Sequence, residues 1–340
     1  MQYPTVREAR FYEKIGGNKT VCLTCERRCK IEEGSQGFCG TRVNIGGKLY
    51  TIVYGDISSI SANPIEKKPF FHFHPGTLAL TVGTLSCNFA CPWCQNYEIS
   101  KVRPDPKRAN YISPEEFLDI ALRNDCDGTS ISFNEPTLLL EYSLDLFPIA
   151  KNQGLYNTYV SNGYMTVQAL EALAKAGLDA IKFDVKGDEE VYEKYCGGVK
   201  AEIVWRNAHR ARELSLHVEI VNLVIPGVND DDECLRQLIE KHLKELGPDV
   251  PIHFTRYHPE YKFNAPPTPV KTLEKARELA RSLGVLFPYI GNVPGHRYEN
   301  TWCPQCGELL IKRFGFIVVS NVVTVDNTCP KCGFKIPLIR

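Results

Sequence analysis

The sequence lacks a surplus of charge of either sign. Among its 340 residues, 40 Lys and Arg balance 40 Asp and Glu, so the formal net charge at pH 7 is zero. Such a chain has no broad attraction to nucleic acid or to anionic membranes. It also lacks an apolar run of the roughly 18 residues that a membrane helix needs, and its first residues form no apolar signal region. These absences predict a cytoplasmic protein with no membrane segment and no strong nucleic-acid signal.

Internal repeats and low-complexity segments are missing as well, and the hydrophobic content of 43% argues against disorder. The length predicts two domains, or one barrel-sized domain with small additions. Cysteine, by contrast, is abundant. Eleven of the 14 cysteines fall into three clusters, and clustered cysteines in a cytoplasmic protein more often bind metal than form disulfides.

The middle of the chain alternates short apolar strands with amphipathic helices. Six strand–helix units of this kind predict a parallel sheet with right-handed crossovers, as a partial barrel or a doubly wound open sheet. Ligand chemistry is then expected at the carboxyl ends of the strands. We expect strands at 78–84, 128–133, 156–160, 179–185, 217–225 and 251–257, helices beginning at Ser113 and near 137–152, 166–176, 203–214, 231–246 and 271–283, a hairpin over 43–50 and a linker over 64–75.

Three cysteines follow the first of these strands, where an active-site loop belongs: Cys87, Cys91 and Cys94. A [4Fe–4S] cluster normally takes four cysteines, so three would leave one iron open to a small molecule. A zinc site, or a cluster whose fourth ligand is distant in sequence, remains an alternative at this point.

The spacing C-x3-C-x2-C, with an aromatic residue before the third cysteine, resembles the radical S-adenosylmethionine (radical SAM) superfamily, and Cys-Pro-Trp-Cys-Gln-Asn resembles its pyruvate formate-lyase activating enzymes. The resemblance implies an α/β fold with a partial (β/α)6 TIM-like barrel over residues 76–292. It also implies an enzyme that reductively cleaves S-adenosylmethionine at a [4Fe–4S] cluster, and whose 5′-deoxyadenosyl radical abstracts hydrogen from a substrate.

Further matches to the superfamily lie after successive strands. Asn134 and Glu135 resemble the motif that binds the methionine ammonium, although both glycines of that motif are replaced; alternatively, Asn134 caps a helix. In the fourth strand Lys182, Asp184 and Lys186 share one face, as in an exposed strand or in one that lines a polar lumen. The resemblance implies cofactor contacts from Trp93, Asn96, Asn134, Glu135, Ser161, Asn162, Asp184, Lys186, Val224 and His258.

Two C-P-x-C-G sequences follow residue 293, and their four cysteines predict a structural zinc ribbon, with a rubredoxin-like iron or a second cluster as the alternative: Cys303, Cys306, Cys329 and Cys332. A less regular set near the N-terminus predicts zinc, an auxiliary Fe–S cluster or free thiols: Cys22, Cys25, Cys29 and Cys39. The expected domains are therefore a cysteine-rich segment (1–75), the barrel (76–292) and a zinc-ribbon-like module (293–340).

These flanking modules, with Pro64-Ile65-Glu66-Lys67-Lys68-Pro69 and Gly291-Asn292-Val293-Pro294-Gly295, are similar to the AmmeMemoRadiSam system radical SAM enzymes over nearly the whole chain. That resemblance implies AMMECR-type and Memo-type partner proteins and an electron donor such as flavodoxin or ferredoxin. Two other functions remain open: activation of a glycyl-radical enzyme, and binding of RNA or protein by a zinc ribbon without catalysis.

Overall fold

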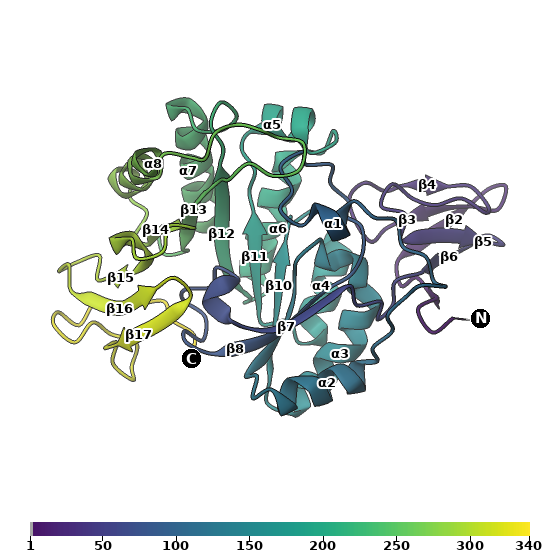
Figure 1. Cartoon of the computed structure of the whole chain (residues 1–340), viewed down its shortest axis with the longest axis horizontal. Coiled ribbons are helices and arrows are strands. Elements are labelled where there is room, and N and C mark those ends of the chain that lie inside the picture. Colours follow the sequence, from purple (N-terminus) through teal and green to yellow (C-terminus); the bar gives the residue numbers. More distant parts are fainter. Residues whose placement is uncertain (1–2) are drawn as a thin grey trace. The chain divides into compact units, whose positions relative to one another are not determined.

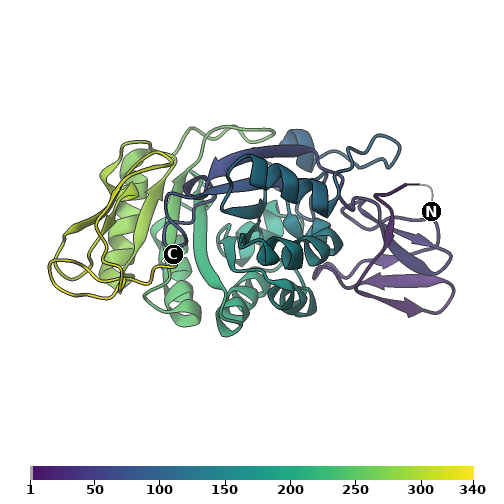
Figure 2. The ribbon, with the colours of Figure 1, turned by 90° about the horizontal axis from the view of Figure 1, so that it is seen from below.

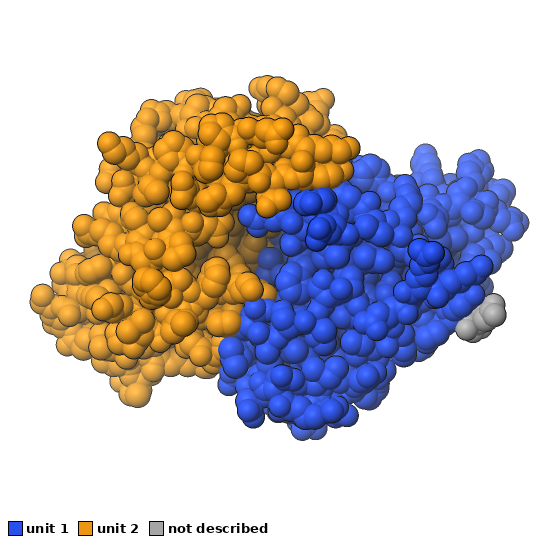
Figure 3. Space-filling model, in the orientation of Figure 1, with its two compact units in different colours: residues 1–63, 78–181 blue, residues 64–77, 182–340 orange. Residues whose placement is uncertain are grey.

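The computed structural model describes residues 3–340, which form two compact units (Figure 3). Unit 1 contains the residues up to 63 together with 78–181, and unit 2 contains 64–77 and 182–340. Strand β11 (Ala180–Asp184) begins in unit 1 and continues in unit 2. This division falls within the segment expected to form the barrel, and the expected boundaries at 75 and 292 stay a prediction.

Unit 1 begins with two small antiparallel sheets, in the orders β2-β3-β4 and β1-β6-β5 (purple in Figures 1 and 2). The hairpin expected over 43–50 is confirmed, because β5 and β6 pair and the intervening Gly46 and Gly47 have φ values of 60° and 75°. A left-handed turn of this kind favours glycine. The strands are β1 (Arg7–Glu8), β2 (Tyr12–Ile15), β3 (Lys19–Cys22), β4 (Lys30–Ile31), β5 (Arg42–Ile45) and β6 (Lys48–Thr51).

The rest of unit 1 is a sheet in the order β10-β9-β8-β7 with its connecting helices. Strands β8, β9 and β10 are parallel, as the strand–helix alternation predicts. Helix α2 begins at the predicted Ser113, whose side chain accepts a hydrogen bond from the Glu116 amide. The elements are β7 (Ser59–Pro64), β8 (Leu78–Gly83), α1 (Tyr97–Ser100), α2 (Pro114–Arg123), β9 (Gly128–Ile131), a 3-10 helix (Pro136–Leu139), α3 (Leu140–Asn152), β10 (Tyr156–Ser161) and α4 (Val167–Ala176).

Unit 2 continues the same architecture in the order β14-β13-β12-β11. Strands β12, β13 and β14 are parallel, and helices connect successive strands (Figure 1). The predicted α/β class with a mostly parallel sheet is therefore confirmed in both units. The elements are α5 (Glu189–Tyr195), α6 (Ala201–Glu213), β12 (His217–Val224), α7 (Asp232–Leu246), β13 (Ile252–Arg256), α8 (Val270–Leu283) and β14 (Pro288–Gly291).

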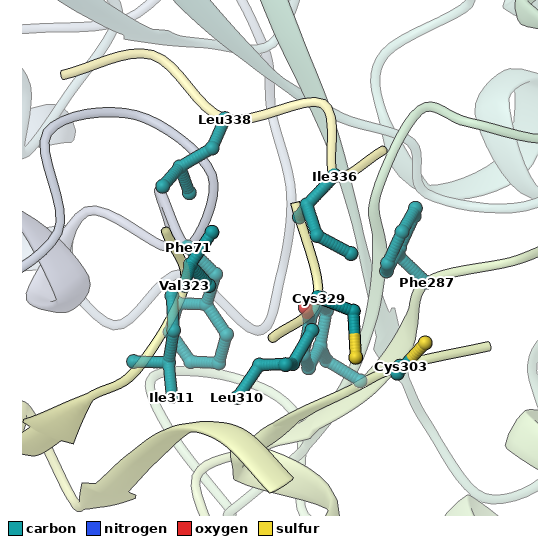
Figure 4. Close-up of a cluster of buried hydrophobic side chains, with 10 residues drawn as sticks. Phe71, Phe287, Cys303, Leu310, Ile311, Val323, Cys329, Ile336 and Leu338 are labelled. Carbon is teal, nitrogen blue, oxygen red and sulfur yellow. The ribbon is translucent and has the colours of Figure 1, made fainter. Parts of the chain in front are cut away.

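The C-terminal part of unit 2 is a small antiparallel sheet in the order β15-β16-β17. Its buried side chains form one apolar cluster with residues of β14 and of the 64–77 segment, including Phe71, Leu310 and Ile336 (Figure 4). The module therefore has a continuous core with the rest of unit 2. Its elements are a 3-10 helix (Arg297–Glu299), β15 (Thr301–Trp302), β16 (Leu309–Phe314) and β17 (Ile317–Asn321).

The segment 64–75, which the sequence predicts to be a linker, is instead largely buried within unit 2. It begins with a 3-10 helix (Ile65–Lys67), and Phe70, Phe71, His72 and Phe73 are all buried in unit 2. The aromatic side chains favour burial over solvent exposure, which composition alone did not reveal. None of the helices in the described part of the chain is long and apolar enough to cross a membrane.

Candidate functional site

The three-cysteine loop follows β8 and is closed at its base by two interactions of Ser86. The Ser86 amide donates to the Ile99 carbonyl oxygen at 2.9 Å, and its hydroxyl donates to the Cys39 carbonyl oxygen at 2.5 Å. Ser86 has a φ of 73°, in the left-handed region that residues other than glycine rarely adopt, so the surrounding loop must stabilise this strained backbone conformation. All three cysteines of the loop are free of disulfides: Cys87, Cys91 and Cys94. The loop therefore presents three thiols beyond the carboxyl end of β8.

Asparagine side chains from the next strands fasten this loop. Asn134 accepts from the Thr84 amide at 3.2 Å and donates to the Ser86 carbonyl oxygen at 2.6 Å. Asn162 donates to the Asn88 side chain at 2.7 Å. The Asn134 side chain therefore braces the loop. It does not cap the following helix, which was the alternative prediction for this residue. Asn88, inside the C-x3-C spacing, was missed by the sequence analysis; a polar side chain between two cysteines is the only signal that could have marked it.

Glu135, Ser161 and Asn162 come together at the carboxyl ends of β9 and β10. Glu135 caps the 3-10 helix by accepting from the Thr137 amide at 3.0 Å. It also accepts from the Ser161 hydroxyl at 2.9 Å and from the Asn162 amide at 2.9 Å. Burial raises the pKa of Glu135, although the hydrogen bonds from Thr137 and Asn162 oppose the shift. These donors favour the ionised form of Glu135 against the effect of burial, and its carboxylate lies close enough to the loop to act electrostatically on Cys87.

The Glu135 carboxylate affects the nearest thiol. Burial and the Glu135 carboxylate raise the pKa of Cys87 to about 12, which keeps the thiol protonated when no metal is present. A cationic metal reverses this preference, because a coordinating thiol is deprotonated outright. The other sequence-predicted residues of this loop are Trp93, which is buried, and Asn96, whose side chain donates to the Phe133 carbonyl oxygen.

In unit 2, the expected charged face of β11 is present. Lys182 lies 2.6 Å and Lys186 3.6 Å from the Asp184 carboxylate, and Lys182 is buried. Burial acts to raise the pKa of Asp184, but the two ammonium groups outweigh burial and lower the pKa. Asp184 is therefore ionised at neutral pH. At the ends of the next strands, Val224 is buried and His258 is exposed.

The four C-terminal cysteines converge as a metal site would require. Their sulfur atoms all lie within 4.8 Å of one another, with Cys303 and Cys332 at 3.5 Å and Cys306 and Cys329 at 3.6 Å. Four sulfurs at about 2.3 Å from one tetrahedral ion would be about 3.8 Å apart, so the donor set fits zinc or iron. Figure 4 shows Cys303 and Cys329 beside the apolar cluster, where a bound ion would stabilise the fold.

The N-terminal cysteines are arranged differently. Cys22, Cys25 and Cys39 are all buried. Burial raises the pKa of Cys25, and the neighbouring Cys22 and Cys39 raise it further, so the three thiols are close enough to interact electrostatically. Cys29 is half-buried and accepts a hydrogen bond from the Phe38 amide. Within residues 3–340, the C-terminal set is the only group of metal-binding side chains whose ligand atoms gather within 4.8 Å. Metal binding by the N-terminal set and by the three-cysteine loop stays a prediction.

The fold is thus that of an α/β protein with a three-cysteine loop after its first parallel strand, and the family model of the radical SAM superfamily matches residues 81–239. The chain is 43% identical over 336 residues to an uncharacterized protein of Methanocaldococcus jannaschii, covering 98% of this chain and 100% of that protein. The chain belongs to the radical SAM superfamily and is an enzyme of that class.

Two further comparisons agree with this assignment. The chain is 26% identical over 218 residues to a pyruvate formate-lyase-activating enzyme of Streptococcus mutans, covering 61% of this chain and 76% of that enzyme. Among solved structures, Streptococcus suis SuiB bound to S-adenosylmethionine shares the fold, with a TM-score of 0.51 and 14% identity over 67% of this chain and 53% of that one. Membership implies a [4Fe–4S] cluster and S-adenosylmethionine as cofactors, and radical SAM enzymes typically take electrons from a donor such as flavodoxin or ferredoxin.

Proposed function

We propose that Cys87, Cys91 and Cys94 hold the [4Fe–4S] cluster and that the enzyme abstracts hydrogen from an organic substrate. The observation that carries this proposal is the braced loop itself: three cysteines beyond β8, with the Glu135–Ser161–Asn162 cluster joined to the loop through Asn88. Three thiolates suit a cluster that keeps one iron open for S-adenosylmethionine. When bound, this pair supplies the one-electron cleavage that starts radical chemistry.

The protein's own residues then bind and orient the cofactor. Glu135 is placed to attract the methionine ammonium, since a buried carboxylate forms strong charge-assisted hydrogen bonds. Sequence resemblance assigns the remaining contacts to Trp93, Asn96, Asn134, Ser161 and Asn162 of unit 1 and to Asp184, Lys186, Val224 and His258 of unit 2. Asn134 thus has two roles in this proposal: its side chain braces the loop through Thr84 and Ser86, and it also faces the cofactor.

The proposed setting is cytoplasmic, with AMMECR-type and Memo-type proteins as partners. The proposed zinc at Cys303, Cys306, Cys329 and Cys332 has a structural role, because the module shares its core with unit 2. The N-terminal cysteines are proposed to bind zinc or an auxiliary Fe–S cluster. A glycyl-radical activase is the second candidate, favoured by similarity to the activating enzyme of S. mutans and, over 31% of the chain, to a (2S)-3-sulfopropanediol sulfolyase activating enzyme of Bilophila wadsworthia.

An anaerobic assay tests the proposal. The protein is reconstituted with iron and sulfide, and 5′-deoxyadenosine is measured after addition of dithionite and S-adenosylmethionine. We expect product from the natural protein and from Cys126→Ala, a buried cysteine outside the three clusters, but none from Cys94→Ala. Absence of product from the natural protein, or full activity of Cys94→Ala, refutes the proposal. A glycyl radical on a partner protein would favour the activase.

A further inference from the structure

Unit 2 contains a small cavity at the carboxyl ends of β13 and β14. It has a volume of about 40 Å³, and its polar lining includes Glu66, His253 and Glu299. Its apolar walls include Phe71, Ile290 and Phe316. A single water needs roughly 10–15 Å³ of such space, so the cavity has room for about three water-sized groups.

Two sequence motifs that the cofactor site does not use meet at this cavity. Glu66 comes from Pro64-Ile65-Glu66-Lys67-Lys68-Pro69, and the opposite wall comes from Gly291-Asn292-Val293-Pro294, which directly follows β14. Thr255, Ile290 and Gly291 of the cavity lining lie in the carboxyl halves of β13 and β14, while Asp184, Val224 and His258 lie at or just after the carboxyl ends of β11, β12 and β13. The carboxyl ends of parallel strands lie at one edge of a sheet. The cavity therefore lies at the same edge of unit 2 as the proposed cofactor residues.

Glu66 is the feature that indicates a ligand. Its side chain has no solvent exposure; Oε1 accepts from the Gly76 amide at 2.9 Å and lies 3.7 Å from Nε of Arg313. Its other oxygen, Oε2, has no hydrogen-bond partner among the described residues. A buried carboxylate oxygen without a hydrogen bond is destabilising, so a donor from outside the chain would be favoured there.

The charge of the lining selects the kind of donor. Among the residues that the structure describes, no lysine or arginine lines the cavity, whereas two carboxylates do. Glu299 is fixed by the Gly295 amide at 3.0 Å and the Gly315 amide at 3.2 Å. His253 is held by Glu219 at 2.7 Å, and burial lowers the His253 pKa, so the imidazole adds no positive charge. Burial raises the pKa of both Glu66 and Glu299 while Arg313 opposes the shift at each, so a cation inside the cavity would favour their ionised forms.

A metal ion is a poorer fit. Glu66, His253 and Glu299 are not among the groups of residues 3–340 whose ligand atoms lie within 4.8 Å of one another. Their carboxylates are also occupied in part by backbone amides. A cation that carries its own hydrogen-bond donors and needs fewer ligands suits this spacing better.

We propose that this cavity binds the primary ammonium group of an alkylamine portion of the substrate, with Glu66 and Glu299 as its acceptors. The adjoining methylene groups would lie against Phe71, Ile290 and Phe316, whose apolar surfaces favour a hydrocarbon chain over water. This inference rests on the proposed function, because it assigns a substrate class to the same enzyme. The substrate is thus a molecule with a free aminoalkyl group and not a carboxylate or phosphate.

Binding of small probes to the unmodified protein tests the proposal without any variant. Saturation-transfer NMR is recorded with n-propylammonium, 1-propanol and propionate, which have the same chain length but differ in charge. We expect n-propylammonium to bind at least tenfold more tightly than either other probe. The reason is that hydrogen bonds between charged groups are stronger than those made by a neutral donor. Equal binding of 1-propanol, or preference for propionate, would overturn the proposal.

A matched pair of variants locates the site. Glu66→Gln keeps the acceptor for the Gly76 amide but removes the charge, and should weaken n-propylammonium at least tenfold. Glu278→Gln, an exposed carboxylate of α8, should leave binding unchanged. Circular dichroism establishes that both variants fold, and unchanged binding by a folded Glu66→Gln contradicts the assignment.

The 5′-deoxyadenosine assay separates this proposal from the proposed function. Product formation by a protein that does not prefer the ammonium probe refutes the pocket assignment alone. Ammonium binding by a protein that forms no product refutes the radical function while the pocket remains.

Discussion

The buried carboxylate of Glu219 holds the 64–77 segment in place, and its neutralisation should be costly. Its side chain is fully buried in β12. It accepts from the Phe71 and His72 amides, both at 2.8 Å, from His217 at 3.0 Å and from His253 at 2.7 Å. Burial acts to raise the pKa of Glu219, but the two histidine hydrogen bonds outweigh burial and hold the pKa far below its ordinary value.

Glu219→Gln keeps the size of the side chain and removes its charge. A hydrogen bond to a charged group contributes about 1.5–3 kcal/mol, against about 1 kcal/mol for a neutral one. Three or four weakened bonds therefore predict a loss of about 2–4 kcal/mol in the free energy of unfolding, measured by urea denaturation at pH 7. The control is Glu213→Gln, an exposed partner of Arg210, which should leave the free energy of unfolding nearly unchanged because solvent screens surface ion pairs.

The pH dependence provides a second readout. Because the folded-state pKa of Glu219 lies below the unfolded value of about 4.3, its stabilisation is fully present above that pH and is lost as pH falls toward the folded-state pKa. The difference between the natural protein and Glu219→Gln should be constant from pH 7 to about 5 and shrink below about 4.3. A loss under about 1 kcal/mol at neutral pH, or a difference that grows on acidification, would refute the reasoning.

Three further predictions concern other parts of the chain. Arg42→Met leaves buried Glu141 without the guanidinium at 2.8 Å and should cost about 3–5 kcal/mol in urea denaturation, whereas adding Glu141→Leu should recover part of the loss; no recovery would contradict a role for the charge pair. Cys329→Ser should abolish metal retention by the C-terminal module and lower its thermal midpoint, as measured by elemental analysis and calorimetry; unchanged metal content would exclude this site. Ser113→Ala should destabilise unit 1 by about 1 kcal/mol through loss of the α2 cap, and Ser113→Asp should not, in the same denaturation assay.

Together these experiments divide the molecule by role. The Glu219 and Glu66 variants test the part of unit 2 that surrounds the cavity, whereas Arg42→Met tests how the N-terminal cysteine-rich segment is held on unit 1. Arg42 lies in β5 and Glu141 in α3, so the pair joins the small N-terminal sheet that contains β5 to helix α3 within unit 1. The changes in the free energy of unfolding from the two sets of variants should be additive, since substitutions at sites without shared partners usually have independent effects.

Features that depend on neighbouring residues could be predicted from the sequence. The Ser113 cap, the Gly46-Gly47 hairpin and the order of strands and helices follow from backbone preferences and side-chain periodicity over a few positions. The C-P-x-C-G spacing likewise predicted the converging sulfurs of the C-terminal module, because each pair of cysteines forms one tight turn. The class of enzyme followed from the three-cysteine loop and its aromatic neighbour.

Other features came only from the tertiary structure, because they join residues far apart in the chain. Glu219 accepts from Phe71 across 148 positions, and no local pattern marks either partner. Glu66 belongs to the segment predicted to be a linker, yet folding places it 3.7 Å from Arg313 in the lining of a cavity, with one oxygen that has no hydrogen-bond partner among residues 3–340. Periodicity determined which faces would be buried, whereas long-range packing alone decided which charges would meet there and where an acceptor would remain for a ligand.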